Sequence, residues 1–292
     1  MIYTKVVFLD SGIGGIPYMK YFTDCYPNIS TAYIADNKYF PYGTKTKDQL
    51  VKILTELTQK IKNIFDPQII VLACNTASVS ALQELRTQFC DKKFVGTVPA
   101  LRPAILASKT NCIGLLGTER TIEADYIKQL LDLLQADSRC KPELVAMAAP
   151  DLVDFVEHQF ESADESAKIS IVEKYVDRLN SKGVDGIVLG CTHFLFLREQ
   201  FIQAAHNAKP RRIEIFDSVH GVSRRIDELL QGMNNDCKNQ SLQSDNYSQS
   251  AKSKKNIFAI TKNDSSKNLW LHRAEQLGME LDSVHFTGGQ KK

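Results

Sequence analysis

The chain has 292 residues, of which 43% are hydrophobic and 24% charged, and its formal net charge is +2. At about 150 residues per domain this length indicates two domains. A charge so close to zero argues against a dedicated nucleic-acid or membrane-surface protein, so we expect neither kind of partner.

Targeting and redox signals point to a cytoplasmic protein. No apolar run approaches the roughly 18 residues that span a bilayer, and the N-terminus lacks the long apolar stretch of a signal peptide. The seven cysteines include no CxxC pair, which disfavours paired zinc knuckles and thioredoxin-like chemistry. An odd number of scattered cysteines fits a reduced cytoplasmic setting.

Short apolar runs alternate with helical periodicity along the chain. The apolar runs predict strands at 6–9, 31–35, 69–73, 94–98, 112–116, 186–189 and 257–260. The periodic segments predict helices at 46–65, from a cap at Ser78, from Thr121, and at 166–180, 194–205 and 266–277. This alternation is typical of an α/β fold with parallel sheets and helices on both faces.

Two segments of the chain echo each other: IIVLACNTAS at 69–78 and GIVLGCTHFL at 186–195, with cysteines 117 residues apart. The echo predicts two similar α/β lobes. Residues 232–256 are rich in Asn, Ser, Gln and Lys and predict a low-complexity loop. We expect the first lobe to combine 1–98 with 212–292, and the second lobe to comprise 99–211.

Two cysteines follow predicted strands directly. Cys74 lies in ACNTAS and Cys191 in GCTHF. Ligands of open α/β sheets bind beyond the carboxyl ends of the strands, where the next helix offers free N–H groups. A thiol at such a position gains thiolate character. A single buried cysteine is usually structural, but two such turns with matching polar neighbours favour a chemical role.

Other polar turns have several interpretations. Asp10 opens DSGIGG, whose glycines permit a tight turn and close approach to a ligand but lack the spacing of a dinucleotide fingerprint. Asp10 could simply cap a helix, or its carboxylate could tune a nearby thiol. The turn at 41–44 could be an ordinary one.

His193 lies two residues after Cys191. The pair could ligate zinc, but no further ligand cluster completes four positions. His193 could instead polarise or protonate a group near Cys191. The Cys-x5-Arg pattern of phosphatases is missing at both cysteines, and no G-x-S-x-G of a serine hydrolase occurs.

Seven pieces of the sequence together resemble the glutamate racemases of the cofactor-independent aspartate/glutamate racemase superfamily. In order they are FLDSGIGG, ADNKYFPYG, VLACNTAS, VGTVPA, GLLGTERTIEADY, LVDFVE and VLGCTHF. The pieces lie between residues 8 and 194, within a resemblance that covers about residues 6–231, and the pairing of CNTAS with GCTH is highly specific. The chain departs from the family pattern at Leu195, where proline is usual, and in the length of the 232–256 stretch.

The resemblance implies two flavodoxin-like lobes with the site in the cleft between them. It implies that Cys74 and Cys191 are the acid/base residues on opposite faces of the substrate, that Asp10 assists Cys74, and that His193 and Glu157 assist Cys191. The implied substrate-binding residues are Asp10, Ser11, Tyr42, Gly43, Asn75, Thr76, Thr192 and His193. The resemblance further implies L- and D-glutamate as substrates, no cofactor or metal, and a homodimer.

The expected chemistry is inversion at an α-carbon, which removes a proton from one face and returns one to the other. Two thiols suit this reaction because one can be deprotonated while the other is protonated. The resemblance assigns proton removal from L-glutamate to Cys191 and from D-glutamate to Cys74, and D-glutamate would serve peptidoglycan synthesis. An aspartate racemase and a binding protein on the same scaffold are the alternatives.

Overall fold

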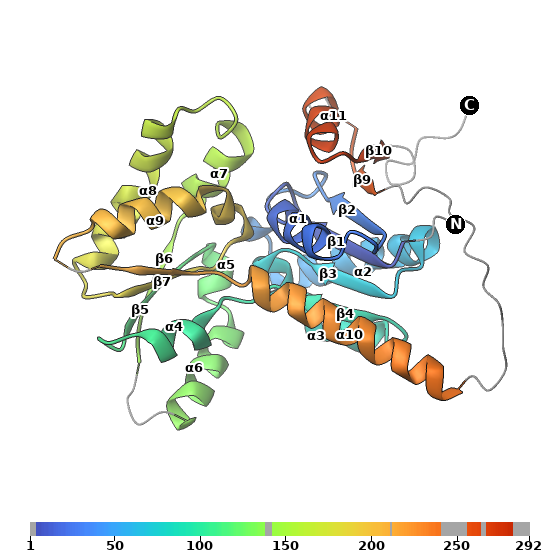
Figure 1. The fold of residues 1–292 in the computed structure, drawn as a ribbon, viewed down its shortest axis with the longest axis horizontal. Helices are drawn as coiled ribbons and strands as arrows, with labels where there is room; N and C mark the ends of the chain where they lie inside the picture. Colours follow the sequence, from blue (N-terminus) through green and yellow to red (C-terminus); the bar gives the residue numbers. More distant parts are fainter. Residues whose placement is uncertain (1–3, 138–141, 211, 241–255, 264–266, 283–292) are drawn as a thin grey trace.

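The computed structural model describes residues 4–137, 142–210, 212–240, 256–263 and 267–282. Within these residues two parallel β-sheets lie side by side, each with helices packed around it (Figure 1). The first sheet has six strands in the order β10-β9-β2-β1-β3-β4. Their bounds are β1 Val6–Asp10, β2 Thr31–Ala35, β3 Ile69–Leu72, β4 Lys93–Gly96, β9 Ile257–Ile260 and β10 Glu280–Asp282.

The second sheet has four described strands in the order β6-β5-β7-β8. Their bounds are β5 Cys112–Gly117, β6 Glu143–Ala148, β7 Gly186–Leu189 and β8 Glu214–Phe216. All neighbours in both sheets pair in parallel. The predicted α/β fold with two parallel sheets is therefore confirmed.

The helices of the first sheet region are α1 Ile16–Cys25, the 3₁₀ turn η1 Tyr42–Thr44, α2 Lys47–Phe65, α3 Asn75–Gln88 and α11 Lys267–Gln276. Those between β4 and the end of the second sheet are α4 Leu101–Ala107, α5 Glu119–Ile122, α6 Asp125–Asp137, α7 Pro150–His158, α8 Glu165–Asn180, the 3₁₀ turn η2 Thr192–Leu197 and α9 Arg198–Asn207. The long α10, Val219–Gln240, then runs back beneath the first sheet (Figure 1).

The central strands of both sheets are fully buried, which is why they appear in the sequence as continuous apolar runs. Every residue of β1, β2 and β3 is buried, and so is every residue of β5 and β7. Helix α2 has a more regular signal, because Thr46 caps it and Gln49 completes a capping box. These elements hold the carboxyl ends of the strands at fixed positions.

Several expected helix starts are wrong in detail. Ser78 does not cap α3, since Cys74 holds the N-cap position and the Ser78 hydroxyl instead donates to the carbonyl of Leu72. Thr121 does not open a helix, because Thr118 caps α5 and accepts the Thr121 N–H. The segment 194–205 begins as a 3₁₀ turn before α9, so its first turn is tighter than an α-helix.

The prediction of a loop over 232–256 is wrong at its start, because residues 232–240 continue helix α10. Residues 241–255 lie outside the described part of the chain. Strand β8 begins after residue 211 yet pairs with β7, so the second sheet extends past the boundary expected there. Apart from these points, the division of the chain into 1–98 plus 212–292 and 99–211 stays a prediction.

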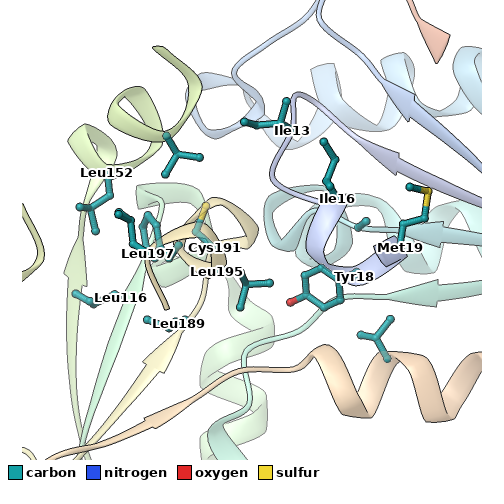
Figure 2. Packing of buried hydrophobic residues seen from close by; sticks show 14 of the residues in the cluster. Ile13, Ile16, Tyr18, Met19, Leu116, Leu152, Leu189, Cys191, Leu195 and Leu197 are labelled. Carbon is teal, nitrogen blue, oxygen red and sulfur yellow. The ribbon is translucent and has the colours of Figure 1, made fainter. Parts of the chain in front are cut away.

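The largest buried hydrophobic cluster runs from one sheet to the other. It includes Phe8 of β1 and Leu189 of β7. Figure 2 shows Cys191 and Leu195 on the η2 turn facing Ile16 and Tyr18 of α1. Among the described helices none combines the length and the apolar character that crossing a membrane requires.

Candidate active site

The two cysteines singled out by the sequence occupy equivalent places in the two sheets. Cys74 follows β3 and caps α3, and Cys191 follows β7 and caps η2. Both have extended backbone dihedrals, and both side chains are buried, with 7% and 6% of their surface exposed. Each strand lies next to its sheet's first strand, β1 or β5. The sequence echo thus reflects two matching strand-to-helix turns.

Cys74 lies in an environment that keeps its sulfur protonated. Burial raises the pKa of the Cys74 thiol well above its ordinary value, and the carboxylate of Asp10 raises it further. The backbone N–H groups of Ala77 and Thr76, at the start of α3, act in the opposite direction. A charge on Cys191 would raise the Cys74 pKa as well.

Asp10 links the first sheet to the turn that carries Cys191. Its Oδ1 accepts the Gly12 N–H at 2.9 Å and the Ser11 hydroxyl at 3.2 Å, and its Oδ2 accepts the Thr192 hydroxyl at 3.0 Å. Complete burial raises the pKa of the Asp10 carboxyl, and the nearby His193 opposes that rise. Asp10, Ser11 and Thr192 are therefore brought together as expected.

His193 and Glu157 form a buried pair beside Cys191. The Nδ1 atom of His193 lies 3.8 Å from the Cys191 Sγ, and its Nε2 atom lies 2.8 Å from the Glu157 Oε1. Burial alone would lower the pKa of His193, but hydrogen bonds to Cys191 and Glu157 bring it well above the ordinary value. Burial would raise the pKa of Glu157, but the His193 hydrogen bond brings it below its usual range. Both pKa shifts favour the charged forms of the pair, an imidazolium and a carboxylate.

The first glycine-rich turn approaches this pair very closely. A Cβ atom on Gly12 would lie 1.9 Å from the Glu157 Oε1, and one on Gly14 would lie 2.5 Å from the His193 Nδ1. Since the Ile13 N–H also donates to the Glu157 Oε1 at 2.8 Å, the turn is packed directly against Glu157 and His193. Lack of a side chain, rather than a left-handed backbone, is what these glycines contribute.

Asn75 is a buried polar side chain with unused hydrogen-bonding capacity. Only 2% of its surface is exposed, and neither its amide oxygen nor its amide nitrogen has a partner among the described residues. Such a group costs about 1–3 kcal/mol unless a ligand or water satisfies it. It follows Cys74 directly in the chain. This makes Asn75 a candidate ligand-binding group.

The remaining expected binding residues lie on turns that meet across the two lobes. Thr76 of α3 is 2.9 Å, Oγ1 to Oγ1, from Thr118, which precedes α5. A Cβ on Gly43 would lie 3.3 Å from Thr118. The hydroxyl of Tyr42 is already occupied, donating to the Asp36 Oδ2 at 2.6 Å. Burial raises the pKa of Tyr42 well above its ordinary value, and nearby charges, that of Asp36 first, add to the rise.

Two site residues were not identified from the sequence. Asp36 is buried and accepts hydrogen bonds from Tyr42 and Thr261, so it ties the η1 turn to the end of β9. Arg273 of α11 is buried and contacts Glu157. Asp36 lay within the ADNKYFPYG piece and could have been noticed there, whereas no local signal marks Arg273.

No cluster of three or more His, Cys, Asp or Glu side chains arranged to hold a metal ion occurs among the described residues. The groups that printed contacts bring together are the carboxylates of Asp10 and Glu157, the His193 imidazole, the Cys191 thiol and the hydroxyls of Ser11 and Thr192. This set can remove and return protons and can bind polar groups of a small molecule.

Comparison with known proteins gives a consistent family. The model of the family described as "Asp/Glu/Hydantoin racemase" matches residues 23–221. A glutamate racemase of Glaesserella parasuis is 33% identical over 80% of this chain and 84% of its own, and one of Treponema pallidum is 37% identical over 76% and 79%. The crystal structure of Escherichia coli glutamate racemase with L-glutamate and the activator UDP-MurNAc-Ala has a TM-score of 0.76 and 26% identity, covering 95% of this chain and 97% of that one.

The family match spans well over half of the chain, and the relatives above 30% identity cover more than two thirds of it. The matching turns that carry Cys74 and Cys191 lie within the matched region. This chain is a member of the Asp/Glu/Hydantoin racemase family.

Proposed function

We propose that this racemase interconverts L- and D-glutamate by a two-thiol acid–base mechanism that uses no cofactor. The observation that carries the proposal is the placement of Cys74 and Cys191 at equivalent strand ends of the two sheets, each buried beside a carboxylate or an imidazolium. The curated relatives are named glutamate racemases, and the Escherichia coli structure contains L-glutamate.

The surroundings of the two sulfurs suit opposite resting states. Burial and Asp10 keep Cys74 in the protonated form, so it can serve as the acid. His193 carries a positive charge 3.8 Å from the Cys191 sulfur, where it can stabilise a thiolate base. In the L-to-D direction Cys191 would take the α-proton, and Cys74 would donate a proton to the opposite face. The product state, with Cys74 as thiolate and Cys191 as thiol, is the starting state for the reverse reaction.

The carboxylates of glutamate require hydrogen-bond donors. The amide of Asn75 is unpartnered among the described residues, and the backbone N–H groups at the strand-to-helix turns can also donate. The hydroxyls of Ser11 and Thr192 bond to Asp10 and that of Thr76 bonds to Thr118, so these three would exchange their present partners for the substrate. Fixed donors in a site shielded from water also stabilise the negative charge that develops at the α-carbon. Tyr42 and Gly43 would border the substrate from the η1 turn.

Circular dichroism of each glutamate isomer, followed with purified protein and no additive, tests the proposal. The parent should abolish the optical signal of both isomers, while Cys74→Ser and Cys191→Ser should lose at least about 10²-fold in rate, as expected for an acid–base group. Cys90→Ser, at an exposed cysteine, is the control and should keep the parental rate. Racemisation at the parental rate by both active-site variants would exclude the two-thiol mechanism.

The same assay separates the alternatives. Faster turnover of L-aspartate than of L-glutamate would indicate an aspartate racemase. Binding of D-glutamate without any change in optical signal would indicate a binding protein on this scaffold. Activity should survive chelators and carbonyl reagents, and stimulation by added pyridoxal phosphate would contradict the cofactor-free mechanism.

In the cell, we propose that the enzyme acts in the cytoplasm as a homodimer and supplies D-glutamate for peptidoglycan. Expression of the chain in a bacterial strain that requires external D-glutamate should restore growth without it. Sedimentation analysis of the purified protein should give twice the mass of the 32.8 kDa chain, and a monomer would contradict the dimer.

A further inference from the structure

Arg273 is a buried cation at the end of the described chain that reaches across to the second lobe. It lies on α11, which is packed on the first sheet, and its side chain is 6% exposed. Its Nη2 donates to the Glu157 backbone carbonyl at 2.8 Å, and its Nη1 lies 3.4 Å from the Glu157 Oε2. The guanidinium also stacks over Trp270, with 5.1 Å to the ring centroid. Buried arginines of this kind are held for their geometry as well as their charge.

Glu157 is the point where these contacts meet the site. Its Oε1 accepts both the Ile13 N–H and the His193 Nε2, each at 2.8 Å. Its Oε2 faces Arg273. Because both oxygens are occupied, the carboxylate has a single orientation, and in that orientation it directs the other ring nitrogen of His193 toward Cys191. The contacts therefore form one buried chain from Arg273 through Glu157 and His193 to the sulfur.

Glu161 holds the other side of Arg273. The Arg273 Nε donates to the Glu161 Oε1 at 3.0 Å, and the Glu161 side chain is 41% exposed. The two acidic partners thus differ in one respect that an experiment can use. Glu157 connects Arg273 to the site, whereas Glu161 connects it only to solvent-exposed surface.

We propose that Arg273 is a positioning residue of the racemase, which fixes the Glu157 carboxylate and thereby orients His193 toward Cys191. The proposal rests on the function proposed above, because it assigns Arg273 to the Cys191 half of the two-thiol site. Arg273 touches neither thiol. Its loss should therefore weaken proton transfer at Cys191 while leaving Cys74 competent.

An experiment without substrate tests the positioning itself. In protein labelled with ¹⁵N at its six histidines, the ring N–H of His193 that is bonded to Glu157 should give a resonance that is absent from His193→Gln. Arg273→Met should shift or broaden this resonance, Arg273→Lys should restore part of it, and Glu161→Gln should leave it unchanged. An unchanged resonance in Arg273→Met would overturn the proposal, whether or not the protein racemises glutamate.

A second experiment asks which thiol is affected. In D₂O, Arg273→Met should racemise glutamate about tenfold more slowly than the parent, less than the roughly 10²–10⁴-fold loss expected for a whole acid–base group. Starting from D-glutamate, Cys74 still removes the α-proton, so recovered substrate should gain deuterium in greater ratio to product than in the parent. Starting from L-glutamate, this ratio should not rise.

The controls separate positioning from a general loss of folded protein. Glu161→Gln should behave as the parent in both directions, and Arg273→Lys should recover part of the rate. A loss of turnover in Arg273→Met with equal deuterium ratios in both directions would mean a merely structural role and would overturn the assignment. A parent that fails to racemise glutamate would instead contradict the proposed function, and the histidine resonance would still decide the role of Arg273.

Discussion

Asp10 is a fully buried carboxyl whose ionised form the fold disfavours. Burial raises its pKa, although His193, the Gly12 N–H and the Thr192 hydroxyl oppose the rise. The folded state therefore binds the Asp10 proton more tightly than the unfolded chain does. By linkage, this residue lowers the free energy of unfolding as pH increases from about 4, the unfolded value, through the raised pKa of the folded state. A cost of this kind is typical of a functional site.

Replacing Asp10 by Asn should therefore stabilise the protein at neutral pH. The amide keeps the oxygen that accepts the Gly12 N–H and carries no charge to desolvate. In urea titrations Asp10→Asn should exceed the parent in free energy of unfolding at pH 7, and the difference should vanish below about pH 4. Racemisation should fall in the same variant. A variant less stable than the parent at pH 7 would contradict the sign of this effect.

Replacing Asn75 should weaken substrate binding without lowering the stability of the protein. Its amide has no partner among the described residues, so Asn75→Ala removes an unsatisfied buried group of about 1–3 kcal/mol. Thermal unfolding of the substrate-free variant should occur at the parental temperature or above it. The KM for glutamate should rise about tenfold or more, because a substrate group loses its donor. A large drop in thermal stability with an unchanged KM would assign Asn75 to the fold alone.

The site residues that the sequence could identify are those in short local motifs. Cys74 and Cys191 stand directly after buried strands, and Asp10 and His193 lie within the same turns. Arg273 could not be found in this way, because its partner Glu157 is 116 residues distant in the chain. A basic residue on a short helix ordinarily faces solvent, and only the three-dimensional packing reveals that this one is buried.

At the scale of elements, strand-to-helix turns of the two lobes are in close contact. The turn between β1 and α1 contacts the η2 turn so closely that a Cβ on Gly14 would come within 2.5 Å of both His193 and Thr192. Gly232 of helix α10 has open space around it instead, because a Cβ there would meet nothing within 4 Å. The two glycines therefore predict opposite effects of the same substitution.

Gly14→Ala should displace the His193 ring and lower racemisation by about tenfold or more, since catalysis depends on sub-ångström placement. Gly232→Ala should leave activity unchanged and increase stability by about 0.5–1 kcal/mol, because alanine is the better helix former. Turnover by circular dichroism and unfolding in urea measure the two effects. Full activity in Gly14→Ala would show that the turns can separate without harm to the reaction.

The strands in the middle of the sheets could be predicted, whereas of the four described edge strands only β4 was, from the run at 94–98. The strands predicted at 31–35 and 186–189 have the same bounds as β2 and β7, because burial on both faces leaves a continuous apolar run. The edge strands β6, β8 and β10 were not predicted. Each is short or partly exposed, as in Glu143–Ala148, so its sequence mixes polar and apolar residues.

At the scale of the whole molecule, one of the three hydrophobic clusters formed by the described residues is shared by the two sheets. The cluster that contains Tyr33 of the first sheet also contains Leu116 of the second, and Ile16 and Leu195 lie where the lobes meet (Figure 2). A polar contact also ties α1 to the residues that follow β8 of the second sheet, the 2.8 Å hydrogen bond between Tyr18 and Ser218. These contacts stabilise the two lobes against each other.

We expect the two sheets to unfold together. Differential scanning calorimetry of the substrate-free protein should give a single transition, with calorimetric and van't Hoff enthalpies in agreement. A Tyr18→Phe variant, which loses the hydroxyl contact to Ser218, should lower the midpoint of that one transition without splitting it. Two resolved transitions in the parent would mean that the lobes fold independently despite their shared core.

The order of strands in the first sheet has a consequence for how the protein is made. Strand β9 pairs with β2, although more than 200 residues, including the whole second sheet, are translated between them. On the ribosome, β2 therefore presents an unpaired edge until the last part of the chain emerges, and such edges invite pairing with other chains. A nascent polypeptide of this kind would depend on chaperones for longest at that edge.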